Sequence, residues 1–158
     1  FNEILIIANE NINFMQSKKI SITKDFKNGL GPLGGVLTAM RWIIEKNKKY
    51  KWISTFPTDT PFFTKKELNF FYENIDLNQS KLFFIKDKNK RHNIFGLWSL
   101  DLIEQLETDL TKGERKIEFW ANSIGVKIVN IDYKKPDPFF NINTEEDLKK
   151  AIKIINND

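Results

Sequence analysis

The stretch Phe56-Pro-Thr-Asp-Thr-Pro-Phe-Phe63 sets a single carboxylate in a turn bounded by two prolines. It follows the apolar and aromatic run Lys51–Phe56, whose length is typical of a buried β-strand. Pro57 and Pro61 have no backbone N–H to donate to a sheet, so we expect the strand to end there and a stiff turn to begin. Asp59 is therefore predicted to lie just beyond the carboxyl end of a parallel strand, at the sheet edge where open α/β folds bind ligands.

Two roles for Asp59 follow from this position. A carboxylate in such a turn suits a hard cation such as Mg²⁺, which takes oxygen ligands and usually keeps some water and substrate phosphate. Aspartate is also a favoured turn and N-cap residue, so Asp59 could instead cap the turn or the helix that follows it. The stretch alone leaves both roles open.

Length and composition indicate one globular domain. The chain has 158 residues, of which 41% are apolar and 29% charged, and a chain of this size can bury a sizeable core. No apolar run approaches the length of a membrane span, so we expect no membrane partner. The absence of cysteine excludes disulfides, a thiolate metal site and a cysteine nucleophile, and it fits the reducing cytoplasm, the location that we predict.

The net charge of +4 invites comparison with nucleic-acid-binding proteins. Nearly all of the positive charge is lysine, and the arginines are Arg41, Arg91 and Arg115. The lysines are scattered through every segment and alternate with acids, as on solvated faces. The phenylalanines fall at core spacing, which indicates packing before base stacking. We therefore expect no nucleic-acid partner.

Apolar periodicity predicts strands that alternate with helices. Buried-strand patterns occur at residues 4–8, 19–23, 51–56, 81–85, 92–98 and 126–131, and a short extended piece is expected at 139–142. Helix patterns begin near Pro32, Thr64, Ser99, Arg115 and Thr144, and Thr64 with Glu67 and Thr144 with Asp147 have the spacing of capping pairs. The alternation predicts an α/β fold with a mostly parallel sheet flanked by helices, in a single domain over residues 1–158.

Three polar residues follow predicted strands. Asn9, Asp25 and Asp59 each come just after one. If these strands are parallel neighbours, the three side chains converge on one edge of the sheet, which favours a binding site there.

The glycines that follow Asp25 formally match a dinucleotide fingerprint. Gly29, Gly31 and Gly34 have the spacing G-x-G-x-x-G, but the preceding strand is not the first one and a polar insert separates it from the glycines. A nicotinamide or flavin enzyme is therefore disfavoured. Glycines beside a helix N-terminus still let backbone N–H groups approach an anion or a base. The alternative is a tight loop with Pro32 in the first helical turn and nothing bound.

The remaining candidates are polar residues for which a structural role is an equal or better explanation. His92 is the sole histidine and stands at the start of an apolar strand. Arg115 and Lys116 open a helix, where they could hold a phosphate or be surface charges. Asn141 and Asn143 project to one side of an extended segment, so we expect one to cap the last helix and the other to face a ligand.

Together these segments resemble the molybdenum cofactor guanylyltransferases, in order and over nearly the whole chain. The similar segments are Asp25 with Gly31-Pro-Leu-Gly-Gly35, then Phe56-Pro-Thr-Asp-Thr-Pro-Phe62, His92-Asn-Ile-Phe-Gly-Leu-Trp98, Gly113-Glu-Arg-Lys116 and Phe140-Asn-Ile-Asn-Thr-Glu-Glu-Asp-Leu148. The Gly-Pro-Leu and Asp-Thr-Pro segments also occur in related nucleotidyltransferases. The His…Gly-Leu-Trp and Asn-Ile-Asn-Thr segments are more discriminating.

The resemblance implies a Rossmann-like nucleotidyltransferase fold and transfer of GMP from GTP to the phosphate of molybdopterin, with release of pyrophosphate. It makes Asp59 the catalytic residue that holds Mg²⁺. The nucleotide would be bound by Asn9, Asp25, Gly31, Pro32, Leu33, Gly34 and Gly35, besides Asp59. The acceptor would be bound around His92, Arg115, Lys116, Asn141 and Asn143. The implied partners are GTP, molybdopterin or the molybdenum cofactor, and proteins that make or receive that cofactor.

The sequence departs from the family pattern in three places. Thr58 stands where the family usually has cysteine, and Asn93 stands where it has proline. The family's glycine-rich phosphate loop would precede Phe1, which itself leads directly into a strand pattern, so we expect the domain to be N-terminally incomplete. The alternatives are a related nucleotidyltransferase with another nucleotide or acceptor, and a truncated, non-catalytic binding domain.

Overall fold

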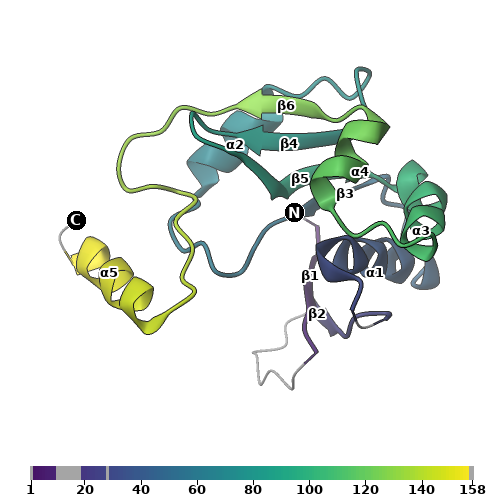
Figure 1. Cartoon of the computed structure of the whole chain (residues 1–158), viewed down its shortest axis with the longest axis horizontal. Helices are drawn as coiled ribbons and strands as arrows, with labels where there is room; N and C mark the ends of the chain where they lie inside the picture. The colour runs from purple at the N-terminus through teal and green to yellow at the C-terminus, as the bar shows by residue number, and fades with distance from the viewer. Residues whose placement is uncertain (1, 10–18, 28, 157–158) are drawn as a thin grey trace. The chain divides into compact units, whose positions relative to one another are not determined.

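The computed structural model describes residues 2–9, 19–27 and 29–156 (Figure 1). Two compact units make up the chain, one formed by Phe1–Ile53 with Trp98–Ile124 and the other by Ser54–Leu97 with Gly125–Asp158. We call them unit 1 and unit 2 and describe each by itself. No helix in the described part of the chain has the length and apolarity needed to cross a bilayer.

Unit 1 opens with a two-stranded parallel sheet. Strands β1 (Ile4–Ile7) and β2 (Ile20–Thr23) pair in register from Ile4 opposite Ile20 to Ile7 opposite Thr23. The backbone N–H of Ala8 donates to the carbonyl of Thr23 at 2.9 Å, which closes the ladder at the carboxyl ends of both strands. The two predicted strands are confirmed, and they run parallel as expected.

Helix α1 (Gly31–Glu45) supplies the core of unit 1. Its apolar residues recur at helical spacing, and the buried ones are Leu33, Val36, Leu37, Met40 and Ile43. Proline lies in the first turn, where its missing donor costs nothing. At Gly34 a Cβ atom would lie 2.5 Å from the Cβ of Leu30, so the chain can enter the helix this closely only with glycine.

The second half of unit 1 contains a 3₁₀ turn, η1 (Leu100–Leu102), and two helices, α3 (Ile103–Thr111) and α4 (Ile117–Ile124). Ser99 begins the turn as predicted, accepting from the N–H of Asp101 at 3.3 Å. Buried Trp98 stacks on buried Trp120 of α4, with ring centroids 6.0 Å apart. This stacking packs α4 against Trp98 within unit 1.

A second sheet, most of which belongs to unit 2, has the strand order β3-β5-β4-β6. Its strands are β3 (Trp52–Thr55), β4 (Leu82–Lys86), β5 (Arg91–Ser99) and β6 (Lys127–Asn130). Strands β4 and β6 are parallel, from Phe83 opposite Lys127 to Lys86 opposite Asn130. A tight turn, closed by the N–H of Asp87 on the carbonyl of Lys90, joins β4 to β5, which therefore runs antiparallel. The sheet is mixed at β5, and the α/β class is confirmed.

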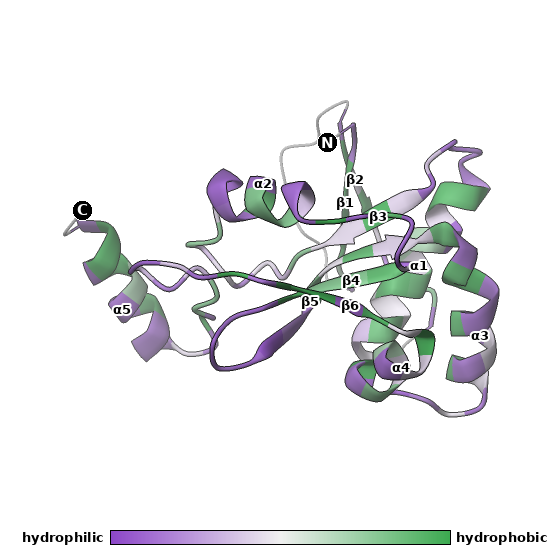
Figure 2. Cartoon of the chain, turned by 90° about the horizontal axis from the view of Figure 1, so that it is seen from above, coloured by the Kyte–Doolittle hydropathy of each residue, from purple (hydrophilic) through white to green (hydrophobic). Residues whose placement is uncertain are grey.

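The core of unit 2 follows from the apolar run in β4. Leu82, Phe83, Phe84 and Ile85 are all buried, as in a strand that is covered on both faces, and β4 is largely green in Figure 2. Unit 2 also holds a cluster of phenylalanine rings, in which Phe95 lies 5.1 Å from Phe139 between ring centroids. The prediction that the phenylalanines form core is confirmed for Phe71, Phe83, Phe84, Phe95 and Phe139. It is wrong for Phe26, Phe70 and Phe119, which are exposed.

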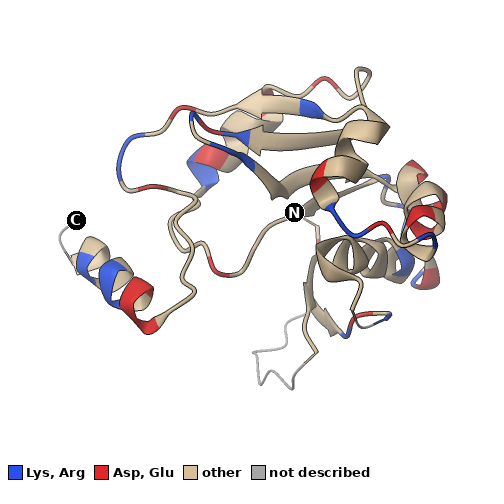
Figure 3. Ribbon diagram, in the orientation of Figure 1, with Lys and Arg blue, Asp and Glu red and all other residues tan. Residues whose placement is uncertain are grey.

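The two helices of unit 2, α2 (Lys65–Glu73) and α5 (Glu145–Asn156), begin at the capping pairs expected from the sequence. Thr64 and Glu67 form a capping box, and the N–H of Asp147 donates to the Thr144 hydroxyl at 3.1 Å. In Figure 3 the acids of α5 lie in its first turn and its lysines further along, which complements the helix dipole.

The short extended piece expected at 139–142 is not a strand. Backbone N–H groups of Phe139 and Phe140 donate to the side chain and the carbonyl of Asp137 at 2.9 and 3.2 Å, which folds the segment into a turn. The N–H of Ile142 donates to the carbonyl of Asp59 instead of to a sheet neighbour. Local hydrogen bonding by aspartate thus overrides the strand pattern.

We predict that Gly34→Ala lowers the free energy of unfolding by about 1–3 kcal/mol, because the new Cβ atom would overlap Leu30. Gly35→Ala is the matched control. Its Cβ atom would meet the Asp25 carboxylate at 3.9 Å, an ordinary contact, so the change should be neutral or stabilising by up to about 1 kcal/mol. Urea denaturation measures both variants, and equal effects would contradict the packing argument.

Candidate functional site

Asn9 and Asp25 form a reciprocal pair at the carboxyl ends of β1 and β2. The side-chain amide of Asn9 donates to Asp25 Oδ2 at 2.8 Å, and the backbone N–H of Asp25 donates to Asn9 Oδ1 at 3.1 Å. The other carboxylate oxygen, Asp25 Oδ1, is buried and has no hydrogen-bond partner among the described residues. Buried polar atoms are normally satisfied, so this oxygen is a candidate ligand contact.

The first turns of α1 lie beside that oxygen. The predicted nucleotide residues Gly31, Pro32, Leu33, Gly34 and Gly35 all fall there, and Gly35 is close enough to Asp25 that a Cβ atom would meet Oδ1 at 3.9 Å. Gly31 has a φ of 64°, which favours glycine. The Leu33 side chain is fully buried in the core, so it offers a ligand only its backbone. Helix N-termini present backbone N–H groups that suit an anionic ligand.

Asp59 and Asn141 form a second aspartate–asparagine pair, in unit 2. The Asn141 side-chain amide donates to Asp59 Oδ2 at 3.1 Å, and the N–H of Ile142 donates to the Asp59 carbonyl at 2.8 Å. Asp59 Oδ1 is buried and unpartnered within the described part of the chain. Thr64 caps α2, so the alternative in which Asp59 caps that helix is wrong.

The two pairs share one arrangement. In each, an asparagine amide fixes one carboxylate oxygen, and the second oxygen is buried with no donor among the residues that the structure describes. Asn9 and Asp25 belong to unit 1 and Asp59 to unit 2, so the expected convergence of all three remains a prediction. The link between Asp59 and Asn141 joins residues 82 positions apart, and no short-range pattern in the sequence predicts that contact.

A metal at Asp59 would rely on few protein ligands. The described residues contain no group of three or more His, Cys, Asp or Glu side chains that could hold a metal ion. The available carboxylate oxygen of Asp59 fits a hard cation that takes its other oxygens from an amide, from water and from a phosphorylated substrate. This donor set suits Mg²⁺ better than a metal that needs nitrogen or sulfur ligands.

His92 lies in a buried cluster at the start of β5. Its ring stacks on Phe139, with centroids 3.7 Å apart, and its Nε2 atom lies 3.2 Å from Asp87 Oδ2. Burial lowers the pKa of His92, and the Asp87 carboxylate opposes that shift. Burial alone would raise the pKa of Asp87, but hydrogen bonds from the N–H groups of Lys90 and Asn89 and from His92 lower it. These contacts give His92 a structural role, and acceptor binding remains a prediction.

Arg115 and Lys116 precede α4, which begins at Ile117 instead of at Arg115. The Arg115 guanidinium donates to the carbonyls of Leu110 and Glu114, both at 2.6 Å. The Glu114 carboxylate accepts from the backbone N–H groups of Arg115 and Lys116, both at 2.8 Å. These two N–H groups are therefore already satisfied by a carboxylate, while the Lys116 ammonium lies 5.2 Å from the centre of the Phe119 ring.

Asn143 stands at the start of α5. Its backbone N–H donates to Asp147 Oδ2 at 3.3 Å, and the hydroxyl of Thr144 accepts from the backbone N–H of Asp147 in the first turn of the helix. The prediction that one of the two asparagines caps this helix is wrong, because Thr144 accepts the Asp147 N–H and the N–H of Asn143 lies outside the helix. Asn141 is the one whose side chain turns to a candidate site residue, Asp59.

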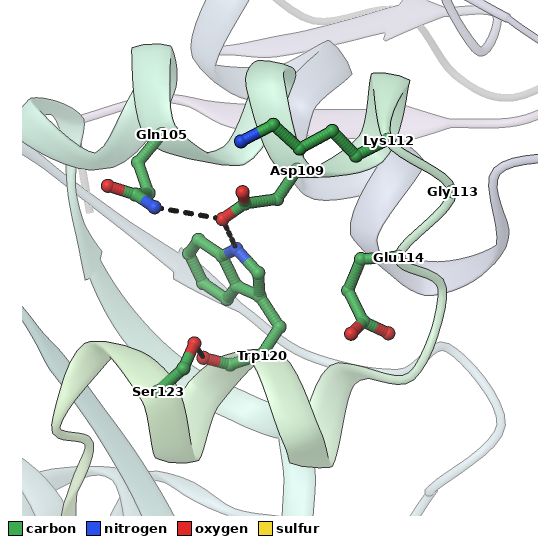
Figure 4. A pocket seen from close by; sticks show the side chains of 7 residues that line it. All are labelled: Gln105, Asp109, Lys112, Gly113, Glu114, Trp120 and Ser123. Carbon is green, nitrogen blue, oxygen red and sulfur yellow. Dashed lines mark hydrogen bonds between the residues drawn. The ribbon is translucent and has the colours of Figure 1, made fainter.

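A polar pocket of about 540 Å³, which no sequence motif predicted, lies between α3 and α4 in unit 1 (Figure 4). Asp109 Oδ2 accepts from the Trp120 indole N–H and from the Gln105 amide, each at 3.0 Å. The spacing of Gln105, Asp109 and Lys112 on one helical face was the available signal. The other lining residues are Gly113, Glu114 and Ser123.

The sequence profile of the MobA-like NTP transferase domain family matches residues 1–124. The chain belongs to this family. The resemblance drawn from the motifs is thereby confirmed. Residues 125–158, which carry Asn141 and α5, lie outside the matched segment.

Curated relatives carry the name molybdenum cofactor guanylyltransferase. The protein of Nitrobacter hamburgensis is 29% identical over 125 residues, which cover 78% of this chain and 60% of the relative. The protein of Rhizobium rhizogenes is 29% identical over 157 residues, covering 95% of this chain and 72% of the relative. The chain thus spans well under the full length of both relatives.

Solved structures share the fold. Molybdopterin-guanine dinucleotide biosynthesis protein A from Archaeoglobus fulgidus superposes with a TM-score of 0.69 at 22% identity, over 87% of this chain and 69% of that one. The 4-diphosphocytidyl-2C-methyl-D-erythritol synthase from Anaerococcus prevotii gives a TM-score of 0.69 at 13% identity, over 98% and 79%. At these identities the likeness shows a nucleotidyltransferase fold, which confirms the predicted fold class.

We predict that acidification destabilises the protein through His92. Its pKa is lowered from 6.5 in the folded chain, so the unfolded chain binds the proton more readily and stability falls as the pH drops below about 6.5. Besides Asp87, the Asp137 carboxylate favours the charged ring, and Lys90 disfavours it. Asp87, whose pKa lies below 3.8, removes further stability only at lower pH.

In His92→Gln the first of these losses should disappear. The variant loses the ring stack on Phe139 and so is less stable at every pH, but its free energy of unfolding should be flat between about pH 6.5 and pH 5, where the wild type declines. Urea titrations across this range measure the slope. Parallel slopes for the two proteins would show that His92 is not the responsible group.

Proposed function

We propose that the protein binds GTP with Mg²⁺ and transfers GMP to the phosphate of molybdopterin, with release of pyrophosphate. Family membership and the names of the relatives support nucleotidyl transfer in molybdenum cofactor synthesis. The observation that supports a specific residue is the state of the Asp59 carboxylate. Asn141 fixes one of its oxygens, and the other is buried with no donor in the described part of the chain.

Asp59 is the proposed metal ligand. Nucleotidyl transfer needs positioning and charge neutralisation more than a covalent nucleophile. When bound, Mg²⁺ supplies that neutralisation on the triphosphate. Asn141 orients the Asp59 carboxylate by holding Oδ2, so Oδ1 is the oxygen offered to the cation. The backbone bond from Ile142 to the Asp59 carbonyl keeps the two segments in register.

Asp25 and the first turns of α1 are the proposed nucleotide side. Asp25 Oδ1 is an acceptor without a donor among the described residues, and a nucleotide offers hydroxyl and N–H donors to such an oxygen. The glycines let a ligand approach the backbone closely. Asn9 contributes indirectly, by holding the Asp25 side chain and backbone. The preference for guanine comes from the resemblance.

The acceptor side is proposed at His92, Arg115, Lys116, Asn141 and Asn143. The structure gives these residues different parts. The His92 ring is buried, whereas Arg115, Lys116 and the two asparagines are exposed. Because the Arg115 guanidinium already donates to two carbonyls, we favour Lys116 and the asparagines. A phosphate-bearing pterin would be attracted by the Lys116 ammonium. We also propose contacts with proteins that make or receive the cofactor. The single-domain organisation and the cytoplasmic location are likewise proposals.

We predict that Asp59→Asn abolishes Mg²⁺-dependent stabilisation by GTP. A ligand at 100 times its Kd stabilises a folded protein by about 2.7 kcal/mol, and the full-length variant should lose most of this gain. Thermal unfolding with GTP, with and without Mg²⁺, measures the effect. Asp132→Asn is the matched control, since Asp132 is an exposed acid of unit 2 whose ion pair with Lys88 contributes little.

The same variant tests the chemistry. Guanylation of molybdopterin by the full-length Asp59→Asn protein should fall by a factor of about 10²–10³, as when one charge-stabilising group is removed from an active site. Unchanged guanylation would show that Asp59 does not hold the metal. If the wild type binds GTP with Mg²⁺ yet transfers nothing, the protein is a binding domain.

We predict that GTP, in the presence of Mg²⁺, stabilises the wild type more than CTP or ATP does. The comparison uses equal concentrations and the same thermal assay, so the shift reports relative affinity. Stabilisation by CTP alone would overturn the guanylyl assignment and favour a related nucleotidyltransferase with another nucleotide.

A further inference from the structure

Thr38 uses its hydroxyl to tie α1 to the segment that carries Asp25. The side chain is 5% exposed, and its hydroxyl accepts from the backbone N–H of Phe26 at 2.9 Å while donating to the carbonyl of Gly34 at 2.9 Å. A hydroxyl that donates to the carbonyl four residues earlier adds little to a helix by itself. Here its lone pair also satisfies a loop N–H.

Arg41, about one turn further along α1, also contacts Phe26 in the segment that carries Asp25. Its guanidinium carbon lies 3.7 Å from the centre of the Phe26 ring, a cation–π contact with a residue that remains 55% exposed. The Arg41 guanidinium also donates to the Glu107 carboxylate of α3. Phe26 is therefore held twice by α1, through its backbone by Thr38 and through its ring by Arg41.

Asp25 immediately precedes this anchored residue. Asn9 holds Asp25 from the strand side, through its backbone N–H and its Oδ2 atom. Phe26 is fixed on the helix side. The Asp25 carboxylate then has one oxygen, Oδ1, without a hydrogen-bond partner among the described residues, and this oxygen lies beside Gly35 in the first turns of α1. The position of this oxygen relative to the glycines thus depends on the tie between Thr38 and Phe26.

We propose that Thr38 is a positioning residue for nucleotide binding, which holds the Asp25 carboxylate against the first turns of α1. This inference rests on the proposed function, in which Asp25 contacts the nucleotide. Thr38 touches no ligand and acts through Asp25. This role requires a short side chain that donates one hydrogen bond and accepts another. Serine can therefore replace threonine at this position, whereas valine, which has the same shape but no hydroxyl, cannot.

The test measures the Kd for GTP in the presence of Mg²⁺ by equilibrium dialysis of the full-length protein. Thr38→Val should weaken binding roughly tenfold or more, as expected when a binding group is displaced. Thr38→Ser should stay within about twofold of the wild type. In an Asp25→Ala background, Thr38→Val should have no further effect, because the group through which it acts is gone. Equal losses in both backgrounds, or no loss at all, would overturn the proposal.

Amide hydrogen exchange tests the positioning without a nucleotide. The Phe26 N–H should exchange roughly tenfold or more faster in Thr38→Val than in the wild type and Thr38→Ser, while the amides of α1 keep their protection. Unchanged exchange at Phe26 would overturn the proposal, and general acceleration along α1 would show a merely structural role. If the wild type fails to bind GTP, the proposed function fails, and the exchange measurement still decides whether Thr38 fixes this segment.

Discussion

In Asp25 and in Asp59, an asparagine amide donates to one carboxylate oxygen, and the other oxygen has no hydrogen-bond donor among the described residues. A buried acceptor without a donor costs about 1–3 kcal/mol, so a fold retains such an atom where a ligand can use it. In the Asn9–Asp25 and Asn141–Asp59 pairs, the aspartate with this unsatisfied oxygen follows the end of a strand. Each asparagine fixes the direction of the carboxylate to which it donates. The proposed binding of a nucleotide and a metal depends on this constraint, because an unrestrained carboxylate would turn to water or to a neighbouring donor.

Helix α1 serves the core and the candidate site at once. Its apolar face is buried in unit 1, while its first turns carry the glycines and its second and third turns carry Thr38 and Arg41. Packing therefore fixes the glycine turns, and the loop with Asp25 is fixed to them in turn. Only Gly34 is required by close contact, and Gly31 by its backbone conformation, so the remaining glycine, Gly35, is the one whose small size leaves room beside the carboxylate.

The sequence predicts what short-range periodicity controls. The strands around β1, β2 and β4, the buried face of α1 and the capping pair at Thr64 all follow from spacing over a few residues. It does not predict that Asn141 bonds to Asp59, because tertiary contacts bring the two together, nor that Thr38, in an apolar helix, bonds to Phe26. The prediction of an extended piece at 139–142 was wrong because Asp137 accepts hydrogen bonds from backbone N–H groups of that segment.

The Glu114 carboxylate at the entry to α4 has a consequence for selectivity. The backbone N–H groups of Arg115 and Lys116, which precede the first residue of α4, already donate to this anion of the chain itself. A free triphosphate would have to expel this tethered carboxylate, whose effective concentration is high because it is part of the same backbone. A phosphate drawn to this turn therefore has the Lys116 ammonium to pair with, while the backbone donors of Arg115 and Lys116 are already taken.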